Sequence, residues 1–159
     1  MVHIGTTNVI ERTWGVSTLA DNATPPRHFV LIVRDDGQDS DYLSSVCEFL
    51  DIGVEHVTTG DDLRSMLPIL RPMAVIADLD GEVQDGCHVM KMVAEYDRAL
   101  PVLLLTCSDP TLLGAVDAVR EVFGLTQVTT ATDDAGIGTL VDFICQAARD
   151  AGRSRLMRV

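Results

Sequence analysis

Apolar residues occur along this chain in short unbroken runs, which alternate with longer segments where apolar residues recur every three or four positions. Three of the runs are strong: FVLIV at 29–33, MAVIA at 73–77 and PVLLL at 101–105. Runs of this length that are apolar at every position are typical of strands covered on both faces of a sheet. Two weaker strands are predicted at 54–57 and 125–128.

Each predicted strand is followed by a segment with helical periodicity. After the first strand, Tyr42, Val46, Phe49 and Leu50 share a predicted face, and Gly53 ends that helix. A second helix is predicted over 60–70, where Pro68 is expected to end or kink it. Three more helices are predicted from apolar faces made of Val89, Val93 and Tyr96, of Leu112, Val116, Val119 and Phe123, and of Ile137, Leu140, Val141, Ile144 and Ala148.

Five strands alternating with five helices predict βαβ units and a parallel sheet, the pattern of an α/β fold. A length of 159 residues suits one domain of this kind, which we assign to residues 28–149. Residues 1–27 are predicted to be an N-terminal extension, mostly irregular, whose one large apolar side chain, Trp14, is expected to pack onto its own domain. Residues 150–159 are predicted to be a basic C-terminal tail.

Charge and cysteine content limit the classes of function. The formal net charge is −12, and residues 29–148 carry −15 of it while residues 149–159 carry +3. A surface this acidic repels phosphate backbones, so nucleic-acid binding is not expected. No run approaches the roughly twenty apolar residues of a spanning helix, so no membrane span is expected. The four cysteines are widely spaced, which favours reduced thiols in a cytoplasmic protein.

Polar side chains follow the three strongest strands, at the edge of an open α/β sheet where ligands usually bind. Two carboxylates about 4 Å apart repel each other by roughly 4 kcal/mol at an effective dielectric near 20, so a cation or a proton is needed between them. A set of oxygen ligands favours Mg²⁺, Ca²⁺ or Mn²⁺ over zinc. Aspartate also caps helices, but for Asp35 and Asp78, which end the two most buried strands, we favour a functional role. The polar residues at the strand ends are Arg34, Asp35 and Asp36, then Asp78 and Asp80, then Thr106.

The runs VLIVRDD, VIADLDGEVQDG and VLLLT together resemble the receiver domain of two-component response regulators over about residues 29–148. The resemblance implies a flavodoxin-like, doubly wound (βα)5 fold with a five-stranded parallel sheet in the order 2-1-3-4-5. It implies that Asp78 accepts a phosphoryl group and that Thr106 is the switch hydroxyl. It also implies Mg²⁺ as cofactor, held by Asp35, Asp78 and the backbone carbonyl of Asp80.

The chain departs from the family pattern at several positions. Arg34 stands where the family has the first acid of an acidic pair. Asp35 matches the acid that helps to hold Mg²⁺, and Asp36 follows it. The lysine that ends the fifth strand in the family is missing, since 124–134 reads GLTQVTTATDD and the chain's only lysine is Lys91. The switch aromatic of that strand has no match, and Gln127 is interpreted as taking its place.

The missing lysine removes one of the cations that phosphoryl transfer uses, and Arg34 in place of an acid weakens the divalent site. Two hypotheses remain open for Arg34: its guanidinium pairs with Asp78 or Asp35 and stands in for the metal or the lysine, or it points to solvent beside a degraded site. The sequence therefore predicts a stand-alone, atypical receiver domain that acts mainly by protein–protein interaction. It is not expected to be an enzyme, although phosphorylation of Asp78 from a phosphodonor is retained as an impaired activity.

The expected partner is a histidine kinase, a phosphotransfer protein or another regulator. A homodimer through the face made by the fourth helix, fifth strand and fifth helix is a further expectation from the resemblance. The alternative is a haloacid-dehalogenase-like phosphatase, in which Asp78 attacks the phosphoryl group and Asp80 protonates the leaving group. Against that alternative, its motif normally ends the first strand of the domain, whereas two strands precede Asp78 here.

Overall fold

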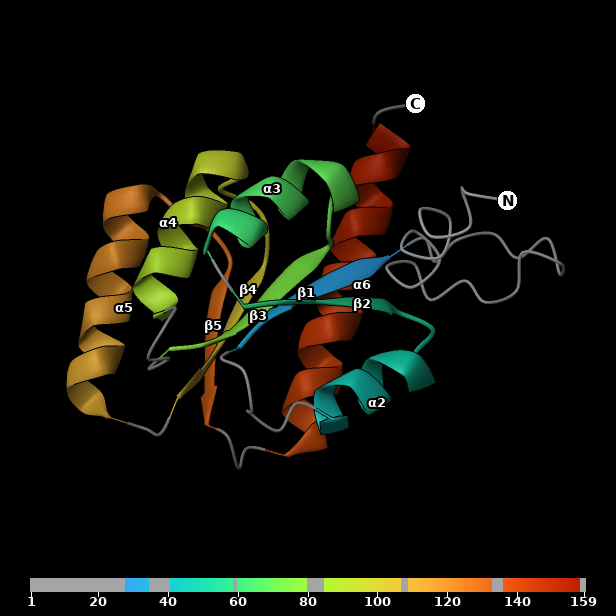
Figure 1. Ribbon diagram of the computed structural model, residues 1–159, viewed down its shortest axis with the longest axis horizontal. Coiled ribbons are helices and arrows are strands. Elements are labelled where there is room, and N and C mark those ends of the chain that lie inside the picture. Colours follow the sequence, from blue (N-terminus) through green and yellow to red (C-terminus); the bar gives the residue numbers. More distant parts are fainter. Residues whose placement is uncertain are drawn as a thin grey trace, which may run out of the picture.

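A five-stranded parallel sheet forms the centre of the molecule in the computed structural model, which describes residues 28–34, 41–58, 60–79, 85–106, 109–132 and 136–157 (Figure 1). The strand order is β2-β1-β3-β4-β5, as predicted. The strands are β1 (Phe29–Val33), β2 (Gly53–Val57), β3 (Ala74–Asp78), β4 (Val102–Thr106) and β5 (Val128–Thr132). The three strong apolar runs became the three central strands, because only a strand with helices on both faces can bury every side chain.

Helices cover both faces of the sheet and divide the core into two clusters. The helices α3 (Gly60–Leu70), α4 (Gly86–Tyr96) and α5 (Pro110–Phe123) cover one face, where Leu63, Val89 and Val116 meet alternate strand residues such as Leu31. The helices α2 (Asp41–Phe49) and α6 (Ile137–Met157) cover the other face. This arrangement confirms the doubly wound α/β architecture expected from the sequence.

The buried face of α2 differs from the predicted face. Leu43 and Cys47 are fully buried, whereas Tyr42 is 39% exposed and Phe49 is 88% exposed. Val46 is partly buried beside them, so the core stripe follows residues 43, 46, 47 and 50 at helical spacing. The prediction was wrong because it weighted bulky aromatic residues, whereas the helix buries its smaller apolar side chains against the sheet.

The fifth strand lies three residues later than predicted, at Val128–Thr132 instead of 125–128. Leu125 is buried, but it belongs to the end of α5: Gly124 adopts a left-handed conformation with φ 71°, and the Leu125 N–H donates to the Arg120 carbonyl. A buried apolar residue after such a cap is a helix-ending feature, and here it imitated the start of a strand. Gln127 consequently precedes β5 and does not take a place within it.

Two helix predictions can be compared with the structure. The helix α3 spans Gly60–Leu70 as predicted, and Pro68 lies inside it and does not end it. The helix α6 continues to Met157, and the boundary that we predicted between residues 149 and 150 falls inside it. Within the described ranges, no helix is both long enough and apolar enough to cross a membrane.

Candidate functional site

The carboxyl ends of β1, β3 and β4 lie side by side at one edge of the sheet. Val33 pairs with Ala77, so Arg34 and Asp78 are the next residues in register on neighbouring strands. Asp78 in turn pairs with Leu105, and Thr106 is the following residue on β4. The strand order thus brings together three of the predicted site residues: Arg34, Asp78 and Thr106.

Arg34 forms an ion pair with Asp78. The Arg34 Nε donates a hydrogen bond to Asp78 Oδ2 at 2.9 Å, and the two side chains are only 11% and 13% exposed. A charge-assisted hydrogen bond with this little solvent around it is stronger than a surface ion pair. Of the two hypotheses for Arg34, the structure therefore supports pairing with Asp78 and contradicts a side chain that points to solvent.

Thr106 ends β4 with its side chain 2% exposed. Among the residues that the structure describes, Thr106 is the one buried polar residue. Its register partner on the outer side is Thr132, the last residue of β5. A buried hydroxyl at the end of a strand, next to the strand that carries a carboxylate, is well placed to donate a hydrogen bond to a group bound there.

The return of the chain after β3 is held by Asp85 and Gly86. The Gly86 N–H donates to the Leu79 carbonyl at 2.9 Å, and the Asp85 side chain caps α4 by accepting from the His88 N–H at 2.7 Å. A Cβ added at Gly86 would lie 2.9 Å from the Leu79 Cα, closer than real Cβ atoms approach. The sequence pattern included this Asp-Gly pair, but its role in closing the chain behind Asp78 became visible only in the structure.

The other predicted site residues, Asp35, Asp36 and Asp80, lie outside the described residues. The described part of the chain holds no cluster of three or more histidine, cysteine or acidic side chains that would suit a metal ion. It offers one carboxylate at this edge, Asp78, and the Arg34 guanidinium stands against that carboxylate. Within the described residues, this single carboxylate, already paired with a cation, does not by itself make a divalent site.

The place of the family's lysine is also changed. Thr132 ends β5 opposite Thr106, and the sequence continues with Asp133 and Asp134, so this strand end gains acidic residues and no lysine. Lys91 lies within α4 and not at the end of a strand. The basic side chain shown in contact with Asp78 is that of Arg34.

Comparison with solved structures identifies the architecture. The signal receiver domain of a modulated diguanylate cyclase from Desulfovibrio desulfuricans is 22% identical, with a TM-score of 0.63 over 79% of this chain and 97% of that one. A chemotaxis response regulator of Vibrio cholerae is 20% identical, with a TM-score of 0.60 over 76% and 98%. The chain has the receiver fold. Neither a protein-family model nor a curated protein matches the sequence.

One receiver structure carries the metal that the resemblance implies. The receiver domain of a sensor histidine kinase from Pseudomonas aeruginosa holds a magnesium ion in its active-site cleft; it is 17% identical, with a TM-score of 0.55 over 77% of this chain and 95% of that one. At these identities the likeness shows the fold. The haloacid-dehalogenase alternative gains no support from the topology, because Asp78 ends the third strand of the described sheet in chain order, in the middle of that sheet.

Proposed function

We propose that this chain is an atypical receiver domain that signals by protein–protein contact, with Asp78 at the phosphoacceptor position and Arg34 as its permanent counter-ion. The observation that carries the proposal is the 2.9 Å contact between Arg34 Nε and Asp78 Oδ2, with both side chains nearly out of solvent. We further propose that the partner is a histidine kinase, a phosphotransfer protein or another regulator, met in the cytoplasm.

The ion pair is expected to slow phosphorylation of Asp78. A carboxylate that attacks phosphorus must offer a lone pair, and the Arg34 hydrogen bond occupies one of the two carboxylate oxygens and lowers its nucleophilicity. The missing lysine removes a charge that would stabilise the transferring oxygens. Thr106, one residue beyond the register partner of Asp78, is left as the hydroxyl that would meet a phosphoryl group.

The same pair is expected to disfavour Mg²⁺. If a divalent ion bound, Asp35, Asp78 and the Asp80 carbonyl would be its proposed ligands, and the ion would neutralise charge on phosphoryl oxygens. A guanidinium in contact with Asp78 places a positive charge where that ion would need a ligand. We propose that the conformation of the site is therefore set without metal or phosphate, so that partners meet a constant surface.

Incubation with acetyl phosphate and Mg²⁺, followed by intact-mass spectrometry, tests the proposal. We expect little or no phosphoryl adduct on the wild-type chain and a clear adduct on Arg34→Asp, which frees Asp78 and restores an acid beside it. The adduct should disappear when Asp78→Asn is added to Arg34→Asp. Arg64→Asp, which makes the same charge change at an exposed helix position, is the matched control and should behave as the wild type.

Rapid, stoichiometric modification of wild-type Asp78 would contradict the proposal, because it would mean that the Arg34 pair does not impede transfer. Modification that survives Asp78→Asn would contradict the assignment of the acceptor.

A further inference from the structure

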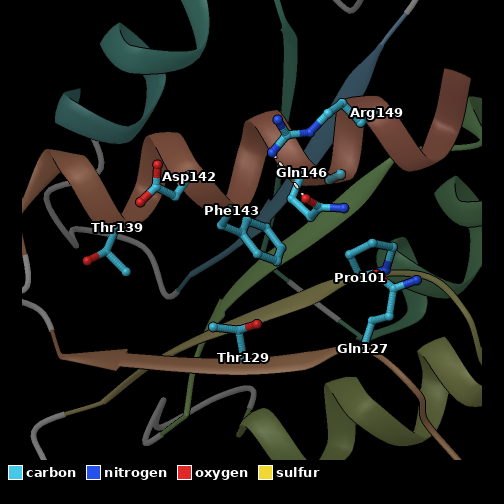
Figure 2. A pocket seen from close by; sticks show the side chains of 9 residues that line it. Pro101, Gln127, Thr129, Thr139, Asp142, Phe143, Gln146 and Arg149 are labelled. Carbon is cyan, nitrogen blue, oxygen red and sulfur yellow. Dashed lines mark hydrogen bonds between the residues drawn. The ribbon is translucent and has the colours of Figure 1, made fainter.

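A groove separates α6 from the sheet at its β5 edge. Two adjoining cavities make up this groove: one of about 450 Å³ between β5 and α6, and one of about 460 Å³ that extends to His28. Pro101, Gln127 and Ala147 line both cavities, so they form one continuous depression. Figure 2 shows its outer half, with Thr129 on β5 facing α6 across the opening.

The wall of the groove contains an aromatic side chain that the core does not fully enclose. Phe143 projects from α6 toward the sheet and is only partly buried (Figure 2). Opposite it, Thr129 on the edge strand β5 is exposed. Among the described residues no strand pairs with the outer edge of β5, and native proteins often cover such an edge with a helix or a loop.

The position of His28 favours the chain's own N-terminal segment as the cover. His28 lines the inner end of the groove, and residues 1–27 join the chain at this point. Trp14 precedes His28 by fourteen residues, which span at most roughly 45 Å when extended. The stretch of α6 along the groove, from Thr139 to Asp150, is only about 16 Å long. The indole of Trp14 is therefore within reach of Phe143.

Charge favours this segment over a second copy of the chain. Residues 1–27 hold two acidic and two basic side chains and are neutral overall, whereas the whole chain carries −12. Two chains of that charge repel each other within a Debye length of about 10 Å. A tethered neutral segment avoids this repulsion and acts at an effective concentration in the millimolar range.

We propose that residues 1–27 dock in the groove between α6 and β5, with the Trp14 indole against Phe143. The docked segment covers the outer edge of β5. It also covers part of the face formed by α5, β5 and α6, through which a homodimer was expected from the receiver resemblance. Docking of this segment does not involve the chemistry at Asp78 and is tested by a separate measurement.

Trp14 is the only tryptophan of the chain, so intrinsic fluorescence reports on this segment alone. In the native full-length chain we expect an emission maximum shifted to the blue of the urea-unfolded chain, and protection from acrylamide quenching. Phe143→Ala removes the contact, and Thr129→Arg fills the groove from an exposed position without touching the core. Both variants should move the emission to the red and raise the quenching constant severalfold. Phe49→Ala, at an exposed aromatic on α2, is the matched control and should change neither.

Circular dichroism and the urea midpoint confirm that each variant is folded, and Thr129→Arg keeps the test valid if Phe143→Ala unfolds. Native emission equal to that of the unfolded chain would overturn the proposal. A protected Trp14 that ignores both groove variants would place the segment elsewhere and would also overturn it. Protection that is lost on dilution would mean docking onto a second copy and would contradict docking within one chain.

Discussion

The Arg34–Asp78 pair differs from the other ion pairs of the molecule in its surroundings. Its side chains are 11% and 13% exposed, whereas those of Arg64 and Glu95, joined at 3.4 Å between α3 and α4, are 64% and 52% exposed. Exposed pairs contribute about 0.2–1 kcal/mol, but removal of one partner from a buried pair costs about 3–5 kcal/mol because it strands the other charge. The burial of the Arg34–Asp78 pair therefore determines how much it contributes to the free energy of unfolding.

A double-mutant cycle measures that difference. We expect Arg34→Ala and Asp78→Asn each to lower the free energy of unfolding by about 3 kcal/mol, with a coupling energy of about 2 kcal/mol between them. The cycle of Arg64→Ala and Glu95→Gln serves as control, with a coupling below about 1 kcal/mol. Equal coupling in the two cycles, measured by urea unfolding, would mean that solvent screens both pairs alike.

Cys47 gives the stability of the chain a pH dependence. Its thiol is fully buried on α2, and burial raises its pKa from 9.0 to about 11. In the unfolded chain the thiol ionises near its ordinary pKa, so the unfolded state is favoured as the pH rises through the interval between the two values. The free energy of unfolding is thus expected to fall above about pH 9 and to level off above about pH 11.

Tyrosine and lysine also titrate in this range, so the test compares the wild type with Cys47→Ala. The variant should lose less stability than the wild type between about pH 8 and about pH 10, as measured by urea unfolding. Parallel loss of stability in the two proteins would show that the thiol does not ionise on unfolding.

At the scale of elements, the strongest apolar runs predicted the structure best. Strands β1, β3 and β4 formed where their unbroken runs indicated, within one residue, because burial on both faces leaves no other pattern. The edge strand β5 was misplaced, since VTTAT is polar enough to resemble a loop while Leu125 is apolar enough to resemble a strand. The face of α2 was misjudged because periodicity gives spacing but does not say which side chains the partner surface accepts.

Gly86 packs directly against Leu79, the residue that follows Asp78. At Gly86 a Cβ would meet the Leu79 Cα at 2.9 Å and the Leu79 Cδ1 at 2.9 Å, so Gly86→Ala must displace the backbone that follows Asp78. We expect a loss of about 1–3 kcal/mol in the free energy of unfolding. Gly114 on α5 has nothing within 4 Å of such a Cβ, and Gly114→Ala should gain about 0.4–1 kcal/mol.

Urea unfolding of the two alanine variants checks this prediction directly. A neutral or stabilising Gly86→Ala would show that the close approach of Gly86 to Leu79 can relax without cost.

At the scale of the whole molecule, the sequence predicted the fold and part of the site. The strand order followed from the receiver resemblance, and the register then placed Arg34 beside Asp78, as one of the two sequence hypotheses required. The predicted metal ligands Asp35 and Asp80 lie outside the described residues and stay predictions. The groove beside β5 was not predicted, because a gap between a helix and an edge strand depends on packing and leaves no periodic signal.

The negative net charge of the chain affects how binding of a divalent ion near the Arg34–Asp78 pair has to be measured. A chain with a net charge of −12 attracts divalent cations in general, yet at the strand edge it places an arginine against the carboxylate that would bind one. General attraction of this kind is screened by salt, whereas a specific site is much less so. Binding measured at physiological ionic strength therefore reports on the site.

Calorimetric titration with Mg²⁺ tests the central claim, that Arg34 takes the place of a divalent ion at Asp78. At physiological ionic strength we predict no saturable binding to the wild type, saturable binding to Arg34→Asp, and loss of that binding when Asp78→Asn is added. Arg64→Asp controls for the change in net charge and should bind no better than the wild type. Saturable one-to-one binding to the wild type, with an affinity that Arg34→Asp leaves unchanged, would contradict the account.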